Sequence, residues 1–347
     1  MRRIALDAMG GDRAPEPELD AVSSVLAEGG VAVTLVGDEA QLRAGLARRG
    51  IADSPRLSIR HATQVVTMDD APASPVRAKK DSSMRVCFDL VKSGEADAVV
   101  SAGNSGAMLA CGLFVFKRLP GVLRPGIVTQ FPTLKGPCVL CDMGANVDVE
   151  AKVLAQFASL GAIYSTVVVG TRRPRVGLLS NGEEAHKGTE LTREAHQLLA
   201  ADEGPFEYVG YVEGRDIFAG EVDVVATDGF TGNVVLKTSE GVASAVVQLL
   251  KQAFASSVRS QLGALMARPA LQSLRQKLDY EETGGAPLLG VDGLALVCHG
   301  RSGGRALANA IRGAARFAER ELVEHVRREF ARWKRDDAAE SSETLKA

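Results

Sequence analysis

The feature that most constrains this chain is a unit that recurs along it: an apolar run, an elbow rich in glycine and asparagine, and a helical pattern. An apolar, β-branched run predicts a buried strand, and apolar residues spaced three and four apart predict a helix. The unit occurs at residues 96–116, 136–160, 173–199, 222–241 and 293–320, and further strands are expected in 4–12 and 31–50. Strands that alternate with helices predict an α/β fold of three layers, in which a mostly parallel sheet lies between two layers of helices.

The elbow TDGFTGN, residues 227–233, has two interpretations. Its two glycines and two capping residues, Thr231 and Asn233, fit a capped turn between a strand and a helix. Free N–H groups and the helix dipole at the same place also favour an anion. Because the carboxyl ends of parallel strands lie at one edge of a sheet, several such elbows are expected to face one cleft, which favours the anion site. No elbow matches GxGxxG or a Walker P-loop, so dinucleotide and ATP binding receive little support.

Composition and charge exclude several classes of protein. With 347 residues, 46% of them hydrophobic, the chain can build a large core. A net charge of −2 gives no support for nucleic-acid binding. Residues 1–12 break at two glycines after a short apolar run, which is typical of a first strand rather than a signal peptide. No apolar stretch approaches the roughly 18–20 residues needed to span a bilayer.

The five cysteines are expected to be buried thiols in a reducing cytoplasm. Cys138 and Cys141 form a CxxC, but it lies in a strand-like run, where positions three apart point to opposite faces. No second CxxC is present to complete a zinc site, so no metal is expected.

One segment departs from the alternation of strands and helices. Residues 242–279 contain two helical patterns, broken near Pro269, and form a helical excursion from a single domain that spans 1–330. Apolar residues share one face of each pattern: Leu262, Leu265 and Met266 on the first, Leu271 and Leu274 on the second. This face either packs against the core or a partner subunit, or lies on an anionic membrane. The charged residues 331–347 are expected to be disordered.

Five motifs together resemble the PlsX family, the phosphate acyltransferases of bacterial phospholipid synthesis. They are DAMGGD (7–12), SAGNSGAML (101–109), DMGANVD (142–148), TDGFTGNVVLKT (227–238) and YEETGGAPLLGV (280–291). They follow in order, and the match extends from residue 1 to about residue 320.

The resemblance implies an α/β/α sandwich similar to the isocitrate and isopropylmalate dehydrogenases and to phosphotransacetylase. It implies transfer of a long-chain fatty acyl group from acyl-[acyl carrier protein] to inorganic phosphate, which gives acyl phosphate, without a cofactor. It also implies a cytoplasmic homodimer that associates peripherally with the cell membrane through the excursion, and a glycerol-3-phosphate acyltransferase that acts downstream.

The sequence departs from the family pattern in three places. Ser105 stands where the family has threonine, which keeps a hydroxyl. In Leu179-Ser180-Asn181-Gly182 the asparagine is moved by one position from the family's Leu-Asn-x-Gly, which puts a role for Asn181 in doubt. The basic run in residues 74–84 is shorter than usual, so part of the carrier-docking charge is missing or lies elsewhere.

The implied reaction needs a phosphate site but no catalytic triad, because phosphate is its own nucleophile. Backbone amides and side chains of two elbows are the expected phosphate ligands: Gly103, Asn104, Ser105, Thr231 and Gly232, with Asn233 in a catalytic role. Asp142, Asn146 and Asp228, at other strand ends, are expected to orient substrate or to hold loops.

Two further residues are candidates for catalysis. Lys187 is expected to stabilise the oxyanion or the phosphate, because the family has a lysine at this place; a solvated loop lysine is the alternative. His299, at the elbow CHGRSGG, either touches the reaction as a proton-transfer group or makes a structural hydrogen bond.

The acidic carrier protein is expected to dock on a basic surface. The densest early cluster of basic residues is Arg77, Lys79, Lys80 and Arg85, which a solvated helix face would also explain. The alternative functions are a phosphotransacetylase-like enzyme that uses short acyl-CoA, an NAD-dependent decarboxylating dehydrogenase, and a non-catalytic membrane scaffold.

Overall fold

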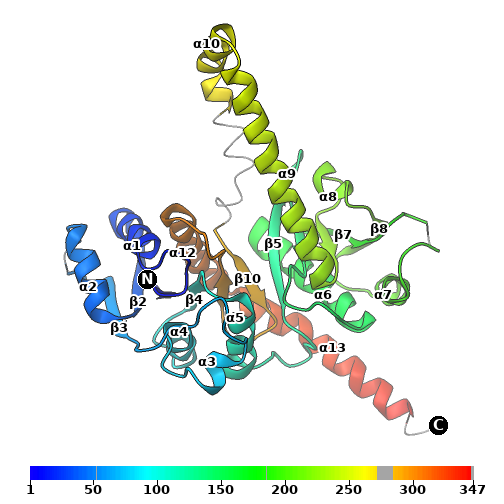
Figure 1. Cartoon of the computed structure of the whole chain (residues 1–347). Helices are drawn as coiled ribbons and strands as arrows, with labels where there is room; N and C mark the ends of the chain where they lie inside the picture. Colours follow the sequence, from blue (N-terminus) through cyan, green and yellow to red (C-terminus); the bar gives the residue numbers. More distant parts are fainter. Residues whose placement is uncertain (52, 185, 272–283, 345–347) are drawn as a thin grey trace.

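The computed structural model describes residues 1–51, 53–184, 186–271 and 284–344, and its described strands form one 11-stranded sheet (Figure 1). The strand order is β3-β2-β1-β4-β11-β10-β5-β6-β9-β7-β8. Their bounds are β1 Arg2–Asp7, β2 Val31–Gly37, β3 Leu57–His61, β4 Ala98–Ser101, β5 Gly126–Pro132, β6 Pro137–Cys141, β7 Arg175–Leu179, β8 Glu207–Val212, β9 Val224–Ala226, β10 Ala286–Leu289 and β11 Ala295–Val297.

Two parallel halves of this sheet run in opposite directions. Strands β3, β2, β1, β4 and β11 are parallel to one another, and so are β6, β9, β7 and β8. Between the halves, β10 pairs antiparallel with both β11 and β5, and β5 pairs antiparallel with β6. The carboxyl ends of the two halves therefore lie at opposite edges of the sheet, and so do the elbows that follow them.

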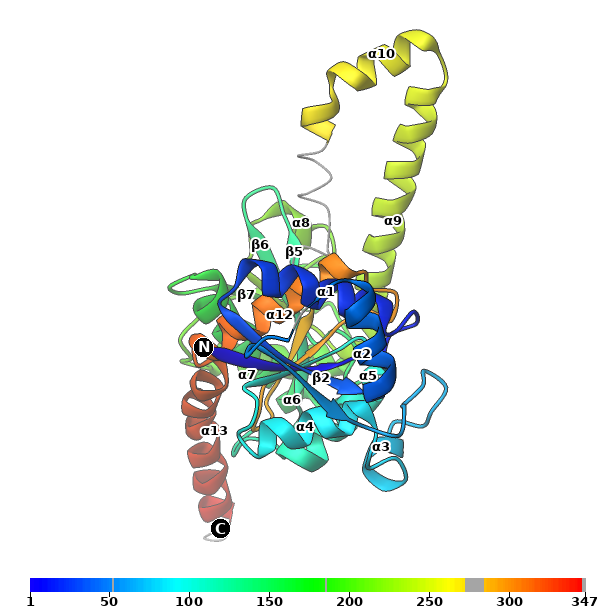
Figure 2. The same cartoon turned by 90° about the vertical axis from the view of Figure 1, so that its left-hand side faces the viewer.

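Helices cover both faces of the sheet, as the three-layer prediction requires (Figures 1 and 2). One core packs α1, α2, α6, α7, α12 and α13 on one face, and a second core packs α4, α5, η1 and α8 on the other. The helix bounds are α1 Glu16–Glu28, α2 Glu39–Arg48, α3 Ser74–Arg77, α4 Ser83–Lys92, α5 Ser105–Cys111, η1 Gly112–Phe116, α6 Ala151–Tyr164, η2 Ser165–Val169, α7 Glu190–Ala201, α8 Asp216–Ala219, α9 Gly229–Ala255, α10 Val258–Met266, α12 Gly304–Glu319 and α13 Leu322–Thr344.

All five cysteines are buried and unpaired with one another. Cys138 belongs to one core and Cys141 to the other, which confirms that the two point to opposite faces of β6. Burial raises the pKa of the Cys138 thiol to about 12. Among the described residues, no group of three or more His, Cys, Asp or Glu side chains could hold a metal ion.

The outer part of α9 and α10 form a helical excursion from the body of the protein. Helix α9 leaves the body of the protein and carries α10 at its far end (Figures 1 and 2). The predicted break near Pro269 corresponds to the end of α10 at Met266. The turn at Ser256–Ser257 was not predicted; the Ser257 hydroxyl there accepts a hydrogen bond from the Ser260 amide at 3.1 Å and so caps α10.

Two other segments differ from the sequence-based expectations. Residues 331–344 continue helix α13 instead of forming a disordered tail. Ala151–Val169 is apolar and long enough to span a membrane by length and composition, although no such stretch was expected. Its apolar window is 72% buried inside the protein, so this helix is a core element of the sandwich.

Candidate active site

A cleft of about 460 Å³ lies where α9 crosses the sheet between the two halves. Its lining comes from β5, the first half of α9, the elbow after β4 and the elbow after β11. Helix α9 begins beside the carboxyl end of β6, where the Gly229 amide donates to the Asn146 carbonyl at 2.8 Å, and then passes the carboxyl end of β11. One helix therefore brings residues from both edges of the sheet into one cleft.

One end of this cleft carries charged side chains around Glu240. The Glu240 carboxylate, with only 8% of its side chain exposed, accepts contacts from Lys237 at 3.2 Å, His299 Nε2 at 3.0 Å and Arg301 at 2.9 Å. Lys237 Nζ also lies 3.4 Å from His299 Nδ1. Ser105 and Ser302 line the same cleft. The cations at this end can therefore hold an anion.

The rest of the lining is mainly apolar. Phe131 and Phe218 meet edge to face, with ring centroids 5.9 Å apart. Other apolar lining residues are Met68, Ile127, Met143, Leu236, Ala243, Ala286, Val297 and Ala306. Such a wall suits an alkyl chain, so the cleft as a whole is built for an amphiphilic substrate.

Four of the predicted substrate residues line this cleft: Gly103, Ser105, Asn233 and His299. Gly103 lies where a side chain has no room, because a Cβ there would lie 2.8 Å from Met84 Cε and 3.4 Å from Gly10 Cα. Its amide donates to the Ser101 hydroxyl at 3.0 Å, which in turn donates to Asp7 at 2.7 Å. This amide is therefore occupied in the structure.

The Asn104 side chain is used to hold its own surroundings. Its Oδ1 accepts from the Ala107 amide at 3.1 Å and caps α5. Its Nδ2 donates to the carbonyls of Thr67, Met68 and Asp70 at 3.0–3.3 Å. Asn104 thus fixes the loop that places Met68 in the cleft.

The opening turn of α9 is capped by Asp228 rather than by Thr231 or Asn233. Asp228 Oδ1 accepts from the Thr231 amide at 2.8 Å, and Oδ2 accepts from the Thr231 hydroxyl at 2.7 Å. Gly232 is buried, and a Cβ there would overlap the carbonyl oxygen of Asp142. Of the residues in this elbow, Asn233 is the one that lines the cleft.

Asp142 and Asn146 form a buried brace. Asp142 accepts hydrogen bonds at 2.7–3.1 Å from the amides of Ile127, Ala145 and Asn146 and from Asn146 Nδ2. Asn146 Nδ2 also donates to the Pro125 carbonyl at 2.7 Å. These bonds hold the loop beneath α9. Of the two expected roles, orienting substrate or holding a loop, the structure therefore shows the second for both residues.

Lys187 lies outside the cleft lining, half-buried in the loop before α7. The Asn181 side chain, at the departure from the family pattern, accepts from the Gly188 amide at 2.9 Å and closes this loop. The Thr189 hydroxyl caps the following helix, α7.

The predicted docking and membrane residues that the structure describes lie on the surface or near it. Lys79 pairs with Asp70, and Arg85 pairs with Asp89, while Arg77 and Lys80 are exposed. Leu262, Leu265 and Met266 are 58%, 65% and 86% exposed on α10. Leu271 is partly exposed, and Leu274 lies outside the described residues.

Sequence reasoning missed Lys237 and Glu240. Lys237 stands in the family motif TDGFTGNVVLKT, but its i, i+3 spacing with Glu240 is common on solvated helices, so the spacing indicated no role for either residue. Only the path of α9 across the sheet brings them to His299.

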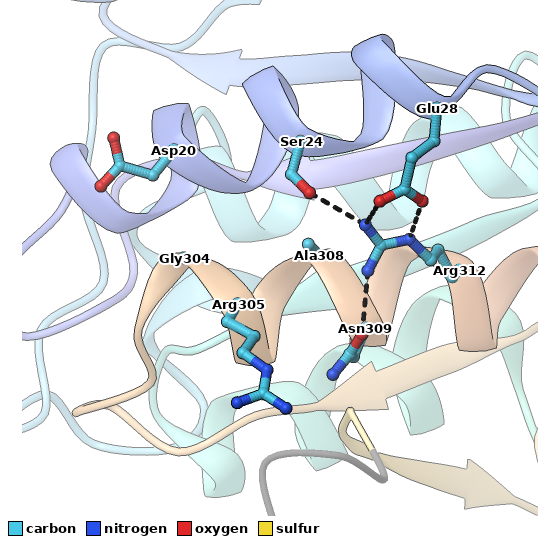
Figure 3. Close-up of a pocket in the computed structure, with 8 residues that line it drawn as sticks. All are labelled: Asp20, Ser24, Glu28, Gly304, Arg305, Ala308, Asn309 and Arg312. Carbon is cyan, nitrogen blue, oxygen red and sulfur yellow. Dashed lines mark hydrogen bonds and ion pairs between the residues drawn. The ribbon is translucent and has the colours of Figure 1, made fainter.

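A second hollow, between α1 and α12, is polar (Figure 3). The Arg312 guanidinium donates to Glu28 at 2.7 Å, to Ser24 at 2.9 Å and to Asn309 at 2.8 Å. These bonds join the two helices, and the lining of this hollow offers no long apolar wall, so the cleft along α9 is the better candidate site.

Comparisons with known proteins cover almost the whole chain. A family model described as "Fatty acid synthesis protein" matches residues 2–325. A phosphate acyltransferase from Geobacter sulfurreducens is 51% identical over 332 residues, which cover 94% of this chain and 95% of that protein. A phosphate acyltransferase from an Anaeromyxobacter species is 48% identical over 328 residues, which cover 94% and 90%.

Solved structures share the fold at low sequence identity. A phosphotransacetylase from Streptococcus pyogenes matches with a TM-score of 0.63 at 18% identity, over 93% of this chain and 94% of that chain. A 4-hydroxythreonine-4-phosphate dehydrogenase from Klebsiella pneumoniae matches with a TM-score of 0.52 at 15% identity, over 92% of this chain and 100% of that chain. Both likenesses support the predicted three-layer α/β architecture.

Proposed function

This chain belongs to the PlsX family of phosphate acyltransferases, and on that premise we propose that it transfers a long-chain fatty acyl group from acyl-[acyl carrier protein] to inorganic phosphate. The observation that carries the proposal is the cleft itself, which joins the charged group around Glu240 to an apolar wall. An acyl phosphate has the same two parts, a charged head and an alkyl chain.

The reaction balances without a cofactor. An oxygen of HPO₄²⁻ attacks the thioester carbonyl carbon, the carbon–sulfur bond breaks, and the proton of the phosphate passes to the leaving thiolate. The products are acyl phosphate and the free carrier thiol. The site must therefore bind phosphate as the dianion, which exists beside the monoanion near neutral pH, stabilise the oxyanion, and align both reactants.

The partners belong to the proposal as well. The exposed Arg77 and Lys80 support docking of an acidic carrier protein, and the exposed apolar side chains of α10 support peripheral contact with the cell membrane. We infer a cytoplasmic homodimer whose product is consumed by a glycerol-3-phosphate acyltransferase.

The proposal is tested by comparing two acyl donors. Purified protein is mixed with phosphate and either palmitoyl-[acyl carrier protein] or acetyl-CoA, and both free thiol and hydroxylamine-trapped acyl phosphate are measured. We expect phosphate-dependent product with the palmitoyl donor and little with acetyl-CoA. The reverse preference would favour a phosphotransacetylase. A Lys187→Ala variant in the same assay decides whether Lys187, outside the cleft lining, belongs to the site.

A further inference from the structure

The phosphate ligands expected from the sequence are largely occupied by the fold. The Asn104 side chain makes hydrogen bonds to α5 and to carbonyls in residues 67–70. The Thr231 amide and hydroxyl both donate hydrogen bonds to Asp228. The Gly103 amide bonds Ser101. The phosphate of the proposed reaction therefore needs other ligands within the same cleft.

The charges around Glu240 suit an anion. Lys237 and Arg301 both contact the Glu240 carboxylate, so two cations lie at this end of the cleft. Burial, followed by the positive charge of Lys237, lowers the pKa of His299, which favours the neutral imidazole. A dianion bound here would be attracted by both cations in a partly desolvated site.

The geometry leaves Lys237 able to turn to a ligand. Its side chain is 49% exposed and its contacts with the Glu240 oxygens are long, at 3.2 and 3.4 Å. If it turns into the cleft, Glu240 keeps its contacts with His299 at 3.0 Å and Arg301 at 2.9 Å. Glu240 therefore stays satisfied while Lys237 is recruited.

We propose that Lys237 and His299 form the phosphate-binding end of the cleft and that Glu240 is the positioning residue that holds both. This assignment rests on the proposed function, because it takes inorganic phosphate as a substrate of the same cleft. Ser105 and Ser302, which line the cleft, would add hydroxyl donors. The acyl chain would extend from there along the apolar wall.

Lys237→Met tests the phosphate contact, with Lys251→Met as the matched control. Lys251 is exposed further along the same helix, outside the cleft lining. We expect Lys237→Met to raise the KM for phosphate at least about tenfold and to change the KM for the acyl donor less than about twofold, since the variant loses a charge-assisted contact with phosphate alone. Lys237→Arg should restore part of the loss, and Lys251→Met should match wild type. An unchanged KM for phosphate in Lys237→Met would overturn the assignment.

Binding of inorganic phosphate alone separates this assignment from the proposed function. Calorimetric titration with phosphate should give weaker binding for Lys237→Met than for wild type, whether or not any acyl donor reacts. Equal phosphate affinities would overturn the assignment even if turnover is confirmed. Absence of turnover with every acyl donor, together with weaker phosphate binding in the variant, would overturn only the proposed function.

Glu240→Gln tests whether Glu240 positions His299 and Lys237. The readout is the titration of His299, which a general loss of stability would not change. The carboxylate and its hydrogen bond raise the pKa of His299, against burial, Lys237 and Arg301, which lower it. Removing the negative charge should therefore move the imidazole titration of His299 to lower pH, followed by NMR with assignment from a His299→Gln variant. The KM for phosphate should rise as well. An unmoved titration would contradict the positioning role.

Discussion

Glu18, on α1, is a buried acid beneath the loop that carries Gly10 and Gly11. Neither of its carboxyl oxygens has a hydrogen-bond partner among the described residues. A Cβ on Gly11 would lie 2.8 Å from Glu18 Oε1, so the carboxyl lies directly against this loop. Burial is the main cause that raises the pKa of Glu18 to about 8 from an ordinary value of 4.5. The folded protein therefore holds a proton here at neutral pH.

This proton makes the free energy of unfolding depend on pH. Between pH 4.5 and about 8 the folded state binds a proton that the unfolded chain has lost, so stability falls as the pH rises through this window. The loss from Glu18 is at most roughly 5 kcal/mol. Glu18→Gln has an uncharged side chain at every pH, so its free energy of unfolding should fall less over this window than that of the wild type. A smaller pH dependence should remain, because the pKa of the buried Asp7 is also raised.

Urea unfolding at pH 5.5 and pH 8.5 checks this prediction. The matched control is Glu16→Gln, on the same helix but exposed and paired with Arg49. Its free energy of unfolding should fall between the two pH values by as much as that of the wild type. If that of Glu18→Gln falls by as much too, Glu18 does not hold the proton.

Two glycines of α9 should respond to alanine in opposite ways. A Cβ at Gly232 overlaps the Asp142 carbonyl oxygen, so Gly232→Ala should lower the free energy of unfolding by about 1–3 kcal/mol. A Cβ at Gly241 meets no atom within 4 Å, and Gly241→Ala should raise it by about 0.5–1 kcal/mol. The denaturant midpoints of Gly232→Ala and Gly241→Ala measure both changes. If the two midpoints shift equally from that of the wild type, the contact between α9 and the Asp142 loop is not close.

At the residue scale, the sequence patterns predicted which residues lie near the cleft more accurately than what each residue does there. Gly103, Ser105, Asn233 and His299 were predicted for substrate and do line the cleft. Asn104, Asp142 and Thr231 were also predicted, but their polar atoms are paired within the fold. A sequence shows which polar groups stand at a strand end; it does not show which of them a neighbouring loop already satisfies.

At the scale of elements, α9 positions the site, since it crosses from the carboxyl end of β6 to that of β11. The repeating unit predicted the strands and helices and the three layers. It did not predict that β10 and β5 run antiparallel to their neighbours, because short apolar strands carry no signal of direction. Several elbows do face one cleft, as the sequence predicts, but they meet there because one helix spans two edges of the sheet.

The apolar wall predicts an effect on acyl chain length. Phe218, on α8, is 40% exposed and lines the cleft, where its ring packs edge to face against that of Phe131. Phe218→Ala should move the preferred donor toward longer acyl chains, because the removed ring leaves space along the wall. Rates with carrier-bound acyl groups of 10 to roughly 18 carbons measure the preference.

The control for this prediction is Phe230→Ala. Phe230 is exposed in the first turn of α9 and is not part of the cleft lining. Its variant should keep the wild-type chain-length profile. The same profile in Phe218→Ala would mean that the acyl chain does not follow this wall.

At the scale of the whole molecule, α10 stands at the far end of α9, away from the sheet (Figure 2). If its exposed leucines contact an anionic membrane, Leu262→Glu combined with Leu265→Glu should abolish co-sedimentation with phosphatidylglycerol vesicles. Activity with the carrier-bound donor in solution should persist, because the cleft lies in the body of the protein.

The control adds the same charge at polar positions of the excursion, Gln252→Glu with Gln261→Glu, both exposed. It should still sediment with vesicles. Light scattering on both variants tests the other interpretation: a leucine variant that still sediments but loses its oligomeric mass would assign α10 to a partner subunit.

The most direct test of the account is to follow labelled phosphate through the reaction. Wild-type protein is incubated with palmitoyl-[acyl carrier protein] and phosphate carrying four ¹⁸O atoms, and the acyl phosphate is weighed by mass spectrometry beside a count of released thiol. Direct attack of phosphate on the thioester predicts one acyl phosphate for each thiol, with all four labelled oxygens retained. Thiol released with free fatty acid, and no labelled acyl phosphate, would contradict it.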